Sequence, residues 1–159
     1  MSSTSGEAPL NTPDQTVLYE EKLRPSFWIW LIAAGVSSAV IVMFAPISMG
    51  AGYGAAVVFA AIVATLLILS TPRIVVTPSS LTVGRATIER EYLGSVEWFG
   101  GDDATYQRGP GLHGLAYLCI RGWISPVVRV EVTDPEDTTP YWLMSSRRPE
   151  RLAEALRTF

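Results

Sequence analysis

The chain has 159 residues and a net charge of −3, from 15 acidic and 12 basic residues, and 48% of it is hydrophobic. This acidic balance excludes a typical nucleic-acid-binding protein, whose binding surface is basic. The single cysteine, Cys119, excludes an internal disulfide and a cysteine-based zinc cluster.

The first segment, residues 1–18, is predicted to be a disordered tail because Ser, Thr and Pro dominate it. Residues 1–24 carry four acidic and two basic residues, which is not the charge of a signal peptide. A second apolar segment follows the first directly. We therefore expect the first apolar helix to be retained as a membrane anchor.

Residues 25–72 form a run of 48 positions without Asp, Glu, Lys, Arg or His. The run is too long for one membrane crossing and suits two. It predicts transmembrane helices at residues 27–44 and about 53–71. Residues 45–54, which contain Pro46 and three glycines, are predicted to include the turn between them. Residues 19–72 are thus predicted to be a transmembrane helical hairpin.

Positive charges predict the orientation of this hairpin. Lys22 and Arg24 precede it, Arg73 follows it, and the connecting turn is uncharged. The positive-inside rule then places both termini in the cytoplasm, as in a two-pass protein of the cell inner membrane.

Small residues recur at four-residue spacing in both helices: Ala34 and Ser38 in the first, and Ala56, Ala60 and Ala64 in the second. Such spacing permits close contact between helices. Two interpretations are open. The small residues pack the hairpin against itself, or they form a binding surface for a partner membrane protein.

Residues 73–159 are predicted to form one small cytoplasmic domain. Short β-branched and aromatic segments, bounded by Gly, Pro and Asp, predict seven strands. These are residues 73–77, 81–83, 86–90, 95–99, 115–120, 127–133 and 139–145, with a long glycine-rich loop at 100–114. An apolar stripe of Leu152, Ala155, Leu156 and Phe159 predicts a closing helix at 149–159.

This order of about seven strands and one final helix resembles a pleckstrin-homology-like domain. The resemblance implies a small β-barrel that the C-terminal helix closes. The expected fold class is therefore a membrane α-helical hairpin plus an α+β domain. Fold alone does not assign a function.

Three segments carry a more specific resemblance: YEEKL at residues 19–23, residues 73–84, and DPEDTTPYWLMSSRRPERLAEAL at 134–156. Together they are similar to an actinobacterial family of two-helix membrane proteins catalogued only as a domain of unknown function. The resemblance implies a bacterial inner membrane location. It brings no activity, cofactor or catalytic residue.

Few residues suggest chemistry. Arg147, Arg148 and Arg151 either contact anionic lipid head groups or form a solvated helix face. The acidic groups at residues 102–103 and 134–137 lack the spacing of a calcium loop. His113 is the sole histidine, and Cys119 lies in an apolar run typical of a buried thiol. We expect no catalytic, cofactor or metal site.

These observations predict a non-catalytic accessory or scaffolding subunit that binds the lipid bilayer and an integral membrane partner. The alternative is a module that senses a lipid head group or small ligand at the barrel mouth and the 100–114 loop. An enzyme is the least supported class, because the sequence lacks a recognisable set of nucleophile, base or metal ligands.

Overall fold

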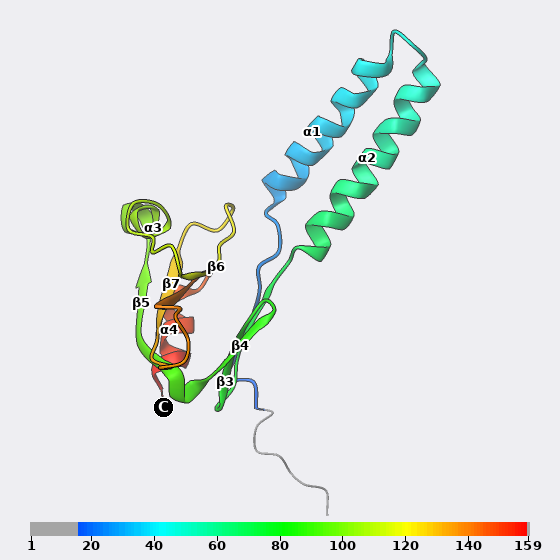
Figure 1. The fold of residues 1–159 in the computed structure, drawn as a ribbon. Coiled ribbons are helices and arrows are strands. Elements are labelled where there is room, and N and C mark those ends of the chain that lie inside the picture. Colours follow the sequence, from blue (N-terminus) through cyan, green and yellow to red (C-terminus); the bar gives the residue numbers. More distant parts are fainter. Residues whose placement is uncertain (1–15, 159) are drawn as a thin grey trace, which may run out of the picture.

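A computed structural model describes residues 16–158, in which a helical hairpin extends away from a β domain (Figure 1). Most of the predicted tail, residues 1–15, lies outside the described residues. The predicted tail extends too far at its end, because Leu18 already joins the β domain. Its N–H donates a hydrogen bond to the Val76 carbonyl at 2.8 Å.

The hairpin consists of α1 (Phe27–Phe44), as predicted, and α2 (Met49–Leu69), which begins four residues before the predicted start. The Ser48 hydroxyl accepts a hydrogen bond from the Ala51 N–H at 3.5 Å and so caps α2. Glycines expected to break the helix are therefore inside it. Both helices are long and apolar enough to cross a membrane, with mean hydropathies of 2.2 and 2.3.

Small side chains make the contact between α1 and α2. Ser37, Gly52 and Ala56 are the buried residues of the two helices. A Cβ atom at Gly52 would lie 3.1 Å from the Ile41 carbonyl oxygen, so the glycine allows the two backbones to approach closely. The Ser37 hydroxyl donates to the Ala33 carbonyl at 2.7 Å, which satisfies it within its own helix.

The hairpin continues into the β domain as a pair of strands. β1 (Tyr19–Lys22) precedes α1, β2 (Arg73–Val76) follows α2, and the two pair antiparallel. Sequence analysis assigned residues 19–22 to the hairpin segment and missed this strand, because a four-residue charged segment has no apolar alternation. Pairing arises because an antiparallel helical hairpin returns the chain beside its starting point.

The β domain contains two four-stranded sheets. Sheet A has the order β1-β2-β3-β4, and sheet B has the order β5-β7-β8-β6. The remaining strands are β3 (Ser80–Val83), β4 (Ala86–Glu89), β5 (Leu93–Phe99), β6 (Tyr117–Cys119), β7 (Val127–Val132) and β8 (Tyr141–Ser145). A 3-10 turn at Arg90–Tyr92 leads from sheet A into sheet B.

This arrangement corrects the predicted barrel. The strands of residues 16–158 form two separate sheets, and no pairing closes them into one. β6 pairs parallel with β8 at the edge of sheet B. It therefore does not pair with β5 or β7, which are its neighbours in sequence. Short strands show their local pattern in the sequence, whereas their order in space depends on distant partners.

One main core lies between the two sheets and the closing helix α4 (Pro149–Arg157). Leu152 and Leu156 of α4 are buried in it, as the apolar stripe predicted. Ala153 is buried beside them, whereas Phe159 lies outside the described residues. Inward residues from both sheets complete this core, among them Leu23, Ile74, Leu81, Val128 and Met144.

A second, smaller core lies on the other face of sheet B. Ala104, Val127, Tyr141 and Leu143 form it. Ala104 belongs to α3 (Gly101–Arg108), a helix within the segment predicted to be a loop. The helix forms although the segment is polar, because burial of Ala104 anchors it. Asp102 and Asp103 occupy its first turn, where acidic side chains favour the helix dipole.

The Gly52 contact generates a test of hairpin packing. Gly52→Leu forces the larger side chain against the Ile41 backbone, and we expect a loss of about 1–3 kcal/mol in stability. Gly54→Leu is the matched control, because no atom lies within 4 Å of its added Cβ. Thermal unfolding of the full chain in mild detergent, followed by circular dichroism, measures both. Equal melting temperatures for the two variants would contradict the described packing.

Candidate functional site

The hairpin has two different outer faces. Val40, Met43, Phe44, Gly54, Ala55, Val58, Phe59 and Ile62 line an apolar groove of about 480 Å³ between the helices. Because successive residues of a helix turn by about 100°, Ala34 projects opposite Met43, and Ala60 projects away from Val58 and Ile62. We call Ala34, Ser38, Ala60 and Ala64 the small-residue face.

The structure separates the predicted small residues by role. Ala56 is buried in the contact between the helices, whereas Ala34, Ser38 and Ala60 are exposed and Ala64 is half-buried. The Ser38 hydroxyl donates to the Ala34 carbonyl at 2.9 Å, so this polar group is satisfied inside α1. The face is therefore apolar in character.

A second feature lies where α2 meets the β domain. A cavity of about 340 Å³ has walls that include Ser70, Pro72, Gly84, Arg85, Tyr117 and Arg121. We call it the juxtamembrane cavity. Gly84 has a φ of 65° in the tight turn between β3 and β4, a conformation that favours glycine. That turn lies beside the start of β2, since the Gly84 N–H donates to the Arg73 carbonyl at 2.8 Å.

The Arg121 guanidinium is held in a fixed position at this cavity. Its Nη2 donates to the Ser70 carbonyl at 2.9 Å, at the C-terminal end of α2. Its Nη1 donates to the Ile120 carbonyl at 2.9 Å. The buried Nε has no hydrogen-bond partner among residues 16–158. A cation at a helix C-terminus is favourable because the free carbonyls there carry partial negative charge.

The predicted arginine cluster divides between two places. Arg147 extends toward the hairpin, and its Nη2 donates to the Arg24 carbonyl at 2.6 Å, just before α1. Arg148 and Arg151 instead line a depression over β1 that also contains Glu20 and Glu154. This second surface is mixed in charge, which is typical of a solvated helix face.

A polar clasp ties β1 to the segment between β8 and α4. The Glu21 carboxylate accepts hydrogen bonds from the Ser146 hydroxyl at 2.6 Å and the Arg147 N–H at 2.7 Å. The Tyr19 hydroxyl donates to the same carboxylate at 2.7 Å. Burial, followed by this hydrogen bond to Glu21, raises the pKa of Tyr19 to about 12.

The other candidate residues, His113, Asp134, Asp137 and Cys119, either bond to nearby backbone groups or are buried. The exposed His113 accepts the Leu115 N–H on Nδ1 at 3.2 Å. Asp134 and Asp137 accept backbone N–H groups two residues further along, as turn residues do. Burial raises the pKa of the Cys119 thiol, which disfavours the reactive thiolate. Across residues 16–158, His, Cys, Asp and Glu side chains do not gather in threes as a metal site requires.

Comparison with known proteins identifies the class of this chain. A family described as a protein of unknown function (DUF3093) matches residues 18–156. The chain belongs to this family, whose match runs from β1 to α4 and includes the hairpin. No curated protein and no solved structure matches the chain.

Two important groups were not recognised in the sequence as site residues. Arg85 was not singled out, yet the equal lengths of β2 and β3 place the turn after β3 beside the end of α2. Arg121 had no comparable signal. Its position depends on the parallel pairing of β6 with β8, which local sequence does not reveal.

The clasp predicts a measurable alkaline effect. An unfolded tyrosine has a pKa near 10 and Tyr19 has one of about 12, so its contribution to stability is complete below pH ~10 and is lost as pH rises to about 12. Tyr19→Phe should lower the melting temperature at pH 8 but flatten its decline across that alkaline window. Tyr106→Phe, at an exposed residue of α3, is the control. An unchanged slope in Tyr19→Phe would contradict the assignment.

Proposed function

We propose that this chain is a non-catalytic accessory or scaffolding subunit that binds an integral membrane partner through its helical hairpin. The observation that carries the proposal is the small-residue face. Ala34, Ser38 and Ala60 are exposed, whereas Ser37, Gly52 and Ala56 make the contact between the helices. Packing of the hairpin against itself therefore accounts for Ala56 but leaves most of this face without a role.

The chemistry of the face favours a helical partner. In lipid there is no hydrophobic driving force between helices, so association depends on close packing of small residues and on hydrogen bonds. The Gly52 contact with Ile41 pairs the two helices so that Ala34 lies near the depth of Ala60. A third helix can then approach both α1 and α2 at one level.

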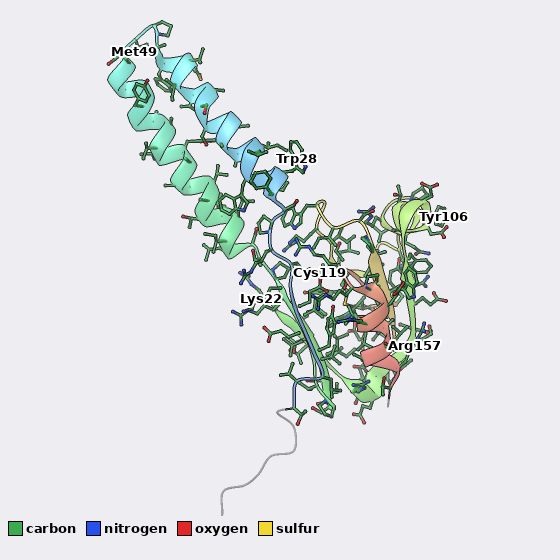
Figure 2. All side chains as sticks on the ribbon, turned by 180° about the vertical axis from the view of Figure 1, so that it is seen from behind. Lys22, Trp28, Met49, Tyr106, Cys119 and Arg157 are labelled. Atoms are coloured by element: carbon green, nitrogen blue, oxygen red, sulfur yellow. The ribbon has the colours of Figure 1, made fainter. Side chains whose placement is uncertain are left out.

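We further propose that the β domain faces the cytoplasm at a bacterial inner membrane. The support is the position of Arg24, Arg73, Arg85, Arg121 and Arg147 around the ends of α1 and α2. The turn at the far end of the hairpin, which lies beside Met49 in Figure 2, contains no charged residue. Eleven of the twelve basic residues are Arg, which favours a GC-rich genome. The resemblance of residues 19–23, 73–84 and 134–156 to an actinobacterial family supports an actinobacterial source.

We also propose a more specific fold for the β domain. We regard the β domain as a divergent pleckstrin-homology-like module, because seven strands of short length precede a helix that packs over the core. The additional strand β1 and the parallel pairing of β6 with β8 are departures from that arrangement.

Topology can be tested by labelling. Cysteines introduced at Ser48 and Thr133, which are both exposed, should react with an impermeant maleimide from opposite sides of the membrane. The native Cys119 is buried and serves as the unreactive background. Labelling of Thr133→Cys in intact spheroplasts would contradict the cytoplasmic position.

The partner surface can be tested by substitution. Ala60→Leu places a bulky side chain on the small-residue face and should reduce recovery of the copurifying membrane partner about tenfold, as expected for a loss near 1.4 kcal/mol. Ala51→Leu is the matched control, because nine residues of separation place it on the opposite side of α2. Quantitative mass spectrometry of the detergent extract measures recovery. Equal recovery with Ala60→Leu and with the parent chain would contradict the proposal.

A further inference from the structure

The juxtamembrane cavity lies at the level where α2 ends and lipid head groups begin. Its walls include Ser70 and Thr71 directly after α2, and Leu69 at its rim is 77% exposed. Leu118, on the β-domain side, is 44% exposed and also borders it. The cavity therefore combines an apolar rim with a polar interior at the height of the membrane interface.

The charge of the cavity is positive. Arg85 and Arg121 line it, and none of the lining residues is Asp or Glu. Neither arginine has a carboxylate partner within 4.0 Å among residues 16–158. The Arg121 guanidinium donates a hydrogen bond to the Ser70 carbonyl at the end of α2. Its positive charge offsets the partial negative charge of the helix C-terminus, which would otherwise repel a bound anion.

The geometry also supplies one cationic group that is held in place and one that is exposed. Two backbone carbonyls hold the Arg121 guanidinium, and its buried Nε has no partner in the described part of the chain. Arg85 is exposed at the tight turn after Gly84. Guanidinium groups match the planar, multidentate geometry of phosphate oxygens.

We infer that the juxtamembrane cavity binds the phosphate group of an anionic phospholipid from the leaflet next to the β domain. The phosphate lies between Arg85 and Arg121, and the acyl chains leave over Leu69 and Leu118 along α2. A soluble phosphoester shares this phosphate chemistry but has no use for the apolar rim. The site is independent of the small-residue face and of the arginines on α4.

Titration of the full chain tests the site. The protein is delipidated in neutral detergent and titrated with short-chain phosphatidylglycerol, or with phosphatidylcholine of equal chain length, and native mass spectrometry counts bound lipid. The parent should prefer phosphatidylglycerol. Arg85→Gln should weaken phosphatidylglycerol about fivefold, as expected for one basic residue near an anionic surface, and leave phosphatidylcholine unchanged. Arg85→Lys should recover part of the loss.

Arg151→Gln is the matched control, because it removes an equal charge from an exposed position on α4. It should change phosphatidylglycerol binding by less than about twofold, since separated surface charges are screened. Equal weakening by Arg85→Gln and Arg151→Gln, or equal binding of the two lipids by the parent, would overturn the proposal. In a separate titration, Arg85-dependent binding of inorganic phosphate without binding of phosphatidylglycerol would contradict the proposal that the bound phosphate belongs to a lipid.

Discussion

The structure depends on one geometric constraint: a chain that leaves the β domain through α1 must return through α2 beside the point where it left. Gly52 brings the two helices close together at the far end. β1 and β2 continue the same antiparallel pairing on the near side, with Lys22 opposite Arg73. The β domain therefore begins with the pair of strands that flanks the hairpin. β3 and β4 then extend the sheet that β1 and β2 begin.

The second organising feature is sheet B, which is buried on both faces. Trp142 and Met144 of β8 point into the main core, whereas Tyr141 and Leu143 point into the smaller one. A strand covered on both sides needs a protein layer on each. Sheet A and α4 supply one layer, and α3 with the following segment supplies the other. This is why the glycine-rich region between β5 and β6 contains a packed helix, α3.

Much of this architecture could be predicted from local sequence, for reasons specific to each element. The uncharged run at residues 25–72 predicted the hairpin because lipid requires long apolar helices. The positions of Leu152 and Leu156 predicted α4, because an amphipathic stripe repeats with the helical period. Strand segments such as residues 127–133 were visible for a similar reason.

What could not be predicted depends on partners distant in sequence. β1 is too short and too charged to show a strand pattern, and it exists because β2 lies beside it. The glycines of residues 100–114 suggested a loop, because the burial of Ala104 beside Leu143 in the smaller core is not visible in the local sequence. The juxtamembrane cavity was missed for the same reason. Its walls come from α2, from the turn after β3 and from β6, which only the fold brings together.

The clasp between Glu21 and Ser146 has a consequence for biosynthesis. The two residues are 125 positions apart, and the whole hairpin is made between them. β1 leaves the ribosome first, but its neighbour β2 appears only after both helices have been made. The hydroxyl and N–H that satisfy Glu21 appear only after the hairpin and strand β8 have been made. The β domain therefore cannot close around β1 until the chain has been made as far as Arg147, although β1 leaves the ribosome before either helix.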